Sequence, residues 1–207
     1  LEASDLSDCD LSGAKLDDAV LVRADLTGAS FDGASLRGCN LGGATFAGAS
    51  FDGCDMSEAV LMRAKLAGAR LTRAKLTDVN LLETELGDVD LSGSSLAGCT
   101  VIKADLGGAK LAGADLSKAT FVDCTFDGAD LSGATLHKAT FVGCEGKGVS
   151  FREADFSYGV MVHGSAFPQA DLRDANLERA NLRGTVLRGA NLDRTRLVDA
   201  DISECDL

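Results

Sequence analysis

Residues 21–40 read LVRADLTGASFDGASLRGCN, and a large apolar residue stands at every fifth position of this stretch. The same spacing covers residues 1–161 and continues, one residue out of step, over residues 167–207. The second residue before almost every large one is small, as Ala24 is before Leu26. An amphipathic helix repeats every 3.6 residues and a strand every two, so a period of five fits neither. It predicts a chain that turns a corner every five residues and stacks on itself.

The uniform repeat predicts one continuous domain over residues 1–207, with residues 1–161 in one frame and 167–207 in the shifted frame. Hydrophobic residues make up 45% of the chain in strict register, and this apolar content excludes a disordered chain. The sequence has neither an apolar run long enough to span a bilayer nor a signal-peptide pattern. We therefore expect no membrane span and a cytoplasmic protein. Because the repeat is already in frame at Leu1, we also expect a module of a longer protein.

The cysteines follow the repeat. Each of the seven stands at the small position of the repeat, two residues before the position of the large apolar one. We expect them to fill the core as reduced thiols, because their spacing suits neither a disulfide framework nor a metal cluster. Only Cys124 and Cys144 are twenty residues apart, so only these two are expected to stack on neighbouring coils.

Units such as Ala24-Asp25-Leu26-Thr27-Gly28 match the pattern A(D/N)LXX. Further examples are the units at 104–108 (ADLGG), 129–133 (ADLSG) and 190–194 (ANLDR). With these units the chain resembles the pentapeptide-repeat family over essentially its whole length. The resemblance implies an all-β fold, a right-handed quadrilateral β-helix with four pentapeptides per coil. In this fold the large and the small residue point inward and the other three point to solvent.

Elementary geometry agrees with that implication. Twenty residues per coil give about ten coils, and a strand spacing of ~4.8 Å then gives a rod roughly 50 Å long. The backbone groups of each coil bond to the coils above and below, which leaves only the two ends unpaired.

One face of the expected rod is apolar on its outside. Residues twenty apart stack on one face, and the face centred on Leu21, Leu41 and Leu61 carries large aliphatic residues at its outward positions. The other faces carry small, polar or charged residues there. The predicted partner-binding residues are Val20, Val22, Val60, Met62, Leu82, Ile102, Val122 and Val142. A contiguous exposed apolar patch usually marks an interface, so we predict that this face docks another protein, a second copy or a neighbouring domain. The alternative is strand propensity, since Val, Ile and Thr suit exposed strands.

Charge is arranged in bands along the chain. The net charge is −12, and residues 1–60 hold eleven acidic against three basic residues, which gives −8. Residues 61–77 then hold five basic residues and no acidic one. The resemblance implies a second candidate function, because some family members imitate duplex DNA and bind DNA gyrase, which modulates the topoisomerase and protects it from quinolones. A banded potential suits that imitation poorly, and direct binding of nucleic acid is disfavoured by the acidic balance.

The repeat has a defect between residues 145 and 168. Gly146 takes the place of a large core residue, and the frame slips by one within residues 162–166. Tyr158, His163 and Pro168 fall in the same window. Two interpretations stay open: a bulge or kink between two stacks of coils, or a recognition loop formed by these four residues.

Catalysis finds no support in the sequence. His137 and His163 are expected on different faces, and no serine or cysteine is paired with a base. We expect no enzyme activity, no cofactor, no metal and no small-molecule substrate. The predicted function is a non-catalytic protein-interaction scaffold. The resemblance implies that such modules also occur in bacterial secretion-associated proteins, including type VI adaptors and effectors.

Overall fold

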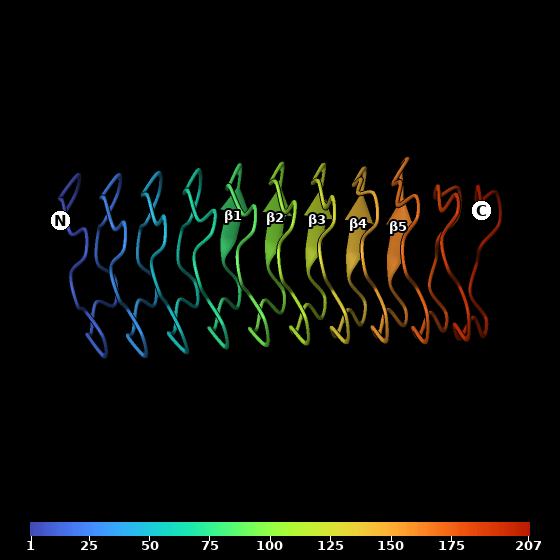
Figure 1. Cartoon of the computed structure of the whole chain (residues 1–207), viewed down its shortest axis with the longest axis horizontal. Helices are drawn as coiled ribbons and strands as arrows, with labels where there is room; N and C mark the ends of the chain where they lie inside the picture. Colours follow the sequence, from blue (N-terminus) through green and yellow to red (C-terminus); the bar gives the residue numbers. More distant parts are fainter.

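The computed structural model describes residues 1–207 and places the two termini at opposite ends of a rod of stacked coils (Figure 1). It contains no helix. Parallel β-bridges join residues twenty apart on successive sides of the coil, for example Asp5 to Asp25 and Asp10 to Ser30. Bridges at every fifth residue and a coil of twenty residues give four sides. The all-β, four-sided solenoid implied by the family resemblance is confirmed, and so is the stacking coil predicted from the period of five.

Each five-residue unit contributes one bridge and one corner. In the unit at 21–25, the Leu21 N–H donates to the Asn40 carbonyl of the next coil at 2.8 Å. The Ala24 N–H closes the corner by donating to the Leu21 carbonyl at 3.1 Å, and the Asp25 N–H donates to Ser4 of the preceding coil at 3.0 Å. The third residue of the unit is left-handed, with φ 56° at Arg23. Glycine is therefore favoured at the corner, but it is not required there.

The core runs along the axis of the rod. The large and small positions of the repeat together form one cluster of 61 buried hydrophobic residues. Five cysteines are buried in this cluster, and Cys9 and Cys205 near the two ends are half-buried. All seven are free thiols. The prediction that cysteine fills the small core position is confirmed.

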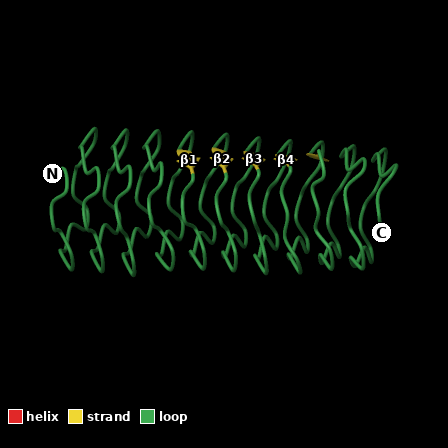
Figure 2. Ribbon diagram, turned by 90° about the horizontal axis from the view of Figure 1, so that it is seen from above, coloured by secondary structure: helices red, strands yellow, loops and turns green.

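One side of the rod carries a flat five-stranded parallel sheet. The strands are β1 (Asn80–Leu82), β2 (Thr100–Ile102), β3 (Thr120–Val122), β4 (Thr140–Val142) and β5 (Val160–Val162), in the order β1-β2-β3-β4-β5. Each strand pairs with the next in a register of twenty. The strand segments of β1–β4 lie along a single edge of the rod when it is seen from above (Figure 2). On the other three sides the coils pair through isolated bridges only.

The coil spacing changes once, at the corner after β5. Glu145 bridges to Ala166, twenty-one residues away, whereas every earlier bridge spans twenty. The extra residue lies in the turn at His163 and Gly164, which have successive left-handed φ angles of 55° and 80°. The predicted bulge is confirmed, and the coils continue on both sides of it (Figure 1).

Candidate functional site

The predicted binding residues all lie on the side of the rod that carries the sheet. We call the set Val20, Val22, Val60, Met62, Leu82, Ile102, Val122 and Val142 the apolar strip. Its members from Leu82 onward are the last residues of β1–β4, and adjacent ones are paired in the sheet. Its members before residue 80 lie on coils without strands. The strip thus has a sheet half and an N-terminal half.

The two halves differ in exposure. Leu82, Ile102, Val122 and Val142 are half-buried between neighbours in the sheet. In the N-terminal half Val20 is 50% exposed and Met62 36% exposed. Val20 lies on the first coil, and the other large hydrophobic side chains exposed to this degree lie toward the two ends of the rod or at Tyr158. The most accessible apolar surface of the strip is therefore its N-terminal half.

A hollow of about 360 Å³ opens in the middle of this N-terminal half. It forms because Gly42 and Gly43 present no side chain between the coils of Val22 and Met62. Its wall is almost wholly apolar. The lining residues are Val22, Arg23, Asn40, Gly42, Gly43, Val60, Met62 and Arg63. The hollow has the chemistry to receive one aliphatic side chain, and its rim carries two cations and no anion.

Charged side chains form a column along one edge of the strip, at the left-handed corner positions. Arg63 pairs with Glu83 through a contact of 2.7 Å, and Arg23 is 3.4 Å from Glu2. The next two residues of the column, Lys103 and Asp123, make no ion pair. The signs alternate from residue 63 to residue 123, but only one pair of the column is closed within the chain.

The four residues of the predicted recognition loop do not converge. Gly146 is buried, and it lines a second hollow together with Pro168. His163 is exposed on the widened corner after β5, and Tyr158 lies on the preceding corner of the coil. The recognition loop stays a prediction: Gly146 and Pro168 share one hollow, whereas Tyr158 and His163 lie on two separate corners of the coil.

Tyr158 is the centre of a small cationic cluster. The Arg179 guanidinium donates to the Tyr158 hydroxyl at 2.6 Å and also lies 5.5 Å from the ring centre. Lys138 lies 5.9 Å from the same centre, and the His137 ring meets it edge-on at 5.5 Å. These contacts hold the aromatic ring against its own neighbours on the rod surface.

Two of the buried thiols resist ionisation. Burial raises the pKa of Cys54 and of Cys99 to about 12 in each case. No three side chains of histidine, cysteine, aspartate or glutamate gather closely enough to hold a metal ion. The structure contains no helix with the length and hydropathy needed to cross a membrane.

Sequence reasoning found the strip but missed the residues that shape the hollow. Gly42 interrupts the aliphatic column, and Gly43 interrupts the charged one. Two adjacent interruptions on one coil are the signal that predicts a depression. Arg23 and Arg63 lie on the two coils that flank this one, so their place on the rim follows from the same spacing of twenty.

Comparison with known proteins agrees with this geometry. A family model described as pentapeptide repeats matches residues 4–161 in overlapping copies and residues 170–207 in a further one. The chain belongs to the pentapeptide-repeat family. The unmatched residues between the two ranges include the widened corner at His163 and Gly164.

Two solved pentapeptide-repeat structures illustrate the likeness. HetL, a pentapeptide repeat protein involved in heterocyst differentiation regulation in the cyanobacterium Nostoc sp. strain PCC 7120, is 28% identical. The match covers 98% of this chain and 89% of HetL, with a TM-score of 0.48. A trypsin-treated variant of QnrB1, a plasmid-mediated fluoroquinolone resistance protein, is 21% identical over 84% of this chain and 91% of its own, with a TM-score of 0.54. The likeness to QnrB1 concerns the fold, and the predicted right-handed quadrilateral β-helix is confirmed. No curated relative matches the chain.

Proposed function

We propose that this pentapeptide-repeat chain is a non-catalytic interaction module that docks another protein through its apolar strip. The observation that carries the proposal is the open apolar hollow at Gly42, flanked by exposed Val20 and Met62. Exposed aliphatic side chains around a hollow are the usual features of a protein contact, in which one partner's side chain fills the other's depression.

Strand propensity accounts for only part of the strip. It suits the half from Leu82 to Val142, where these residues form strands. It does not account for Val22 and Met62, because their coils form no strand. The corners beside them are closed by the ordinary backbone hydrogen bonds of the repeat, which Ala24 and Ala64 donate at 3.1 and 3.0 Å. Aliphatic residues on coils without strands need another reason, and burial by a partner supplies one.

The rod offers rigid docking geometry. The coils that carry the strip are joined to their neighbouring coils by backbone bonds, so little conformational freedom is lost when a partner binds. Burial of aliphatic surface contributes about 25 cal/mol per Å² before the entropic costs of association. A flat sheet half beside a hollowed half provides both contact area and a feature that selects a partner.

The test is a double substitution with a matched control. Leu82→Asp with Ile102→Asp places two carboxylates in the strip, where docking would have to bury them unpaired. Ser92→Asp with Ala112→Asp adds the same charge to the same two coils on the opposite side of the rod. The unaltered chain is expected to self-associate in sedimentation, or to be cross-linked to a cellular protein. The strip variant should lose that contact and the control should keep it, with unchanged circular dichroism in both. If both variants bind as well as the unaltered chain, the proposal fails.

The DNA-mimic alternative requires a continuous row of free carboxylates along the rod. Several carboxylates are instead held by arginines of neighbouring coils: Arg70 lies 3.0 Å from Asp52 and Arg37 lies 3.1 Å from Glu58. A gyrase supercoiling assay separates the two functions. Inhibition at stoichiometric protein that is insensitive to the strip substitutions would favour the alternative.

A further inference from the structure

We propose that the apolar strip docks the strip of a second copy of this chain, with the two rods antiparallel. The two-fold axis of this dimer passes midway between the coils of Met62 and Leu82. The inference rests on the proposed function and names its partner. It follows from the arrangement of charge, and of side-chain size, in columns that a two-fold axis would bring face to face.

The geometry of a four-sided rod limits how two copies can meet. When two identical faces pack with the rods antiparallel, the axis lies in the contact plane and parallel to the strands. Each column then faces the same column of the second copy, with the order of the coils reversed. Because the coils are evenly spaced, one register fixes every pair along the contact.

Charge excludes every register in which the axis passes through a coil near the centre of the strip. An axis on the coil of Arg63 sets that residue against Arg63 of the second copy, and an axis on the coil of Glu83 sets two glutamates together. An axis midway between these coils sets Arg63 against Glu83 of the second copy. It also sets Arg23 against Asp123 of the second copy, and the symmetry generates each of these contacts twice.

Side-chain size selects the same register. With the axis midway between Met62 and Leu82, the bare coil of Gly42 and Gly43 faces the coil of Ile102 and Lys103 in the second copy. The Ile102 side chain then enters the apolar hollow of about 360 Å³. The Lys103 stem passes over Gly43, where no side chain stands in its way. The hollow coil of the strip thus meets a coil that carries a large aliphatic side chain.

The neighbouring registers leave groups unmatched. Moving the axis one coil toward the N-terminus pairs Arg23 with Glu83 of the second copy, but it sets Arg63 against Gly43 there. Moving it one coil the other way sets Gly43 against Gly143 of the second copy and leaves a void. Only the intermediate register gives both arginines a carboxylate and fills the hollow.

The outer pair of charges, Arg23 and Asp123, is available for a contact between copies. Asp123 makes no ion pair within the chain, and Arg23 has only the contact of 3.4 Å to Glu2. Arg23 and Asp123 lie five coils apart, about 24 Å at the coil spacing, so they cannot meet within one rod. A contact between these two residues therefore reports on association alone.

The contact is small. The six coils from Val22 to Val122 face one another in this register and give a contact roughly 30 Å long, at the lower end of the size of specific interfaces. We therefore expect a reversible dimer that forms at micromolar concentrations or above and dissociates on dilution. The ion pairs at its edge make the association weaker in high salt.

The test is a charge exchange measured by sedimentation equilibrium from micromolar to near-millimolar concentration. Arg23→Asp sets two acids together and Asp123→Arg sets two bases together, so each single variant should dimerise at least about tenfold more weakly. The double variant restores opposite charges across the contact and should recover most of the loss. Gly42→Ile should also weaken the dimer by filling the hollow. The new Cβ would stand 3.3 Å from the Asn40 Oδ1, so it fits when the Asn40 side chain shifts slightly.

Rescue of the single variants by the double variant, with unchanged thermal melts, would establish the register. A monomer at every concentration, or single variants that the double variant does not rescue, would overturn it. The strip variant of Leu82 and Ile102 tells the two failures apart. A monomer that is still cross-linked to another protein in a manner that depends on those two residues removes the dimer and leaves the proposed function in place.

Discussion

Gly146 lies so close to Phe126 that a Cβ atom added to the glycine would stand 2.8 Å from the phenylalanine Cβ. The same atom would stand 2.8 Å from the Cγ2 of Val149. In nearly all of the remaining five-residue units, a large residue stands at the position equivalent to that of Gly146. Here the space is already filled by neighbouring side chains, because Phe126 and Phe167 pack edge to face with ring centres 6.2 Å apart. Glycine is the residue that fits.

Gly146→Ala is therefore expected to destabilise the protein, although it moves the sequence toward the repeat consensus. Overpacking of a filled core costs roughly 1 to 3 kcal/mol, and urea unfolding measures it. Gly87→Ala is the matched control, because the nearest atom to a Cβ there is the Gly107 carbonyl oxygen at 3.7 Å. The control should change stability by no more than about 0.5 kcal/mol. Equal effects of the two substitutions would contradict the packing account.

The sequence predicts which positions face inward, and it does not predict how the inward side chains share space. The spacing of five correctly places Cys54 and the glycines of the corners, and the spacing of twenty places the apolar strip. Phe126 occupies the space that a larger side chain at position 146 would need. Whether it does so depends on side-chain rotamers in adjacent coils, and these cannot be read from residues spaced twenty apart in the sequence. The hollow at Gly42 can be predicted only in part. Its two glycines can be found by comparing residues twenty apart, but its walls depend on where the Met62 side chain lies.

Phe141 is the centre of an aromatic cluster around the widened corner. Its ring stacks on Phe121 at 4.8 Å and meets Phe167 at 5.8 Å with an interplanar angle of 87°. Phe141→Ala is expected to cost about 3 to 5 kcal/mol. Because each coil of a solenoid contacts only its neighbours, the loss should be local.

Hydrogen exchange measures where the Phe141→Ala loss falls. Amide protection should decrease in β3, β4 and β5 and stay nearly unchanged in the N-terminal coils. Phe31→Ala is the counterpart, since Phe31 stacks on Phe51 at 4.8 Å in the N-terminal part of the rod. Its effect should fall on that part. A uniform loss of protection in either variant would show that the rod unfolds as one unit.

The half-buried and the buried cysteines should differ in their reactivity toward alkylating reagents at neutral pH. Cys9 and Cys205 are half-buried near the ends of the rod, whereas Cys54 and Cys99 are buried and burial raises the pKa of each to about 12. At pH 7.5 fewer than about one in ten thousand of these two thiols is ionised, and the thiolate is the reactive species. N-ethylmaleimide should label Cys9 and Cys205 in the native protein, and Cys54 and Cys99 only after denaturation, as read by peptide mass spectrometry. Rapid native labelling of Cys54 would contradict the buried position.

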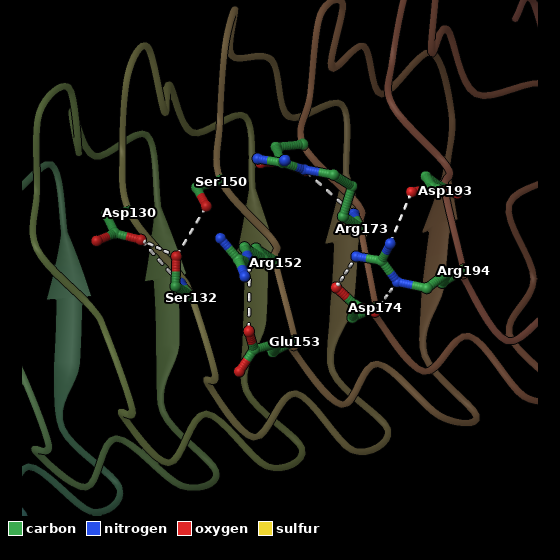
Figure 3. A network of polar contacts seen from close by, with 10 residues as sticks. Asp130, Ser132, Ser150, Arg152, Glu153, Arg173, Asp174, Asp193 and Arg194 are labelled. Carbon is green, nitrogen blue, oxygen red and sulfur yellow. Dashed lines mark hydrogen bonds and ion pairs between the residues drawn. The ribbon is translucent and has the colours of Figure 1, made fainter.

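The ion pair of Asp174 and Arg194 should make a small, pH-dependent contribution to stability. Arg194 donates from Nε to one carboxylate oxygen at 2.6 Å and from Nη2 to the other at 2.8 Å, and Asp193 lies 3.0 Å from the same guanidinium (Figure 3). Hydrogen bonds from Arg194 lower the pKa of Asp174 below its ordinary value. A lowered pKa in the folded state means that the unfolded state binds the proton more readily.

The contribution of this pair is therefore complete above the unfolded pKa of about 4 and disappears as the pH falls through the lower folded value. Asp174→Asn should lower the melting temperature at pH 7 by no more than about 2 °C, because the pair is exposed to solvent. At a pH below both pKa values the variant and the unaltered protein should melt together, since the carboxylate is then protonated in both states. Arg194→Gln should give the same pattern, because it removes the other partner of the same contact. A difference in melting temperature that persists undiminished at low pH would mean that the substitution acts through packing, and the ion pair would then carry no part of the stability.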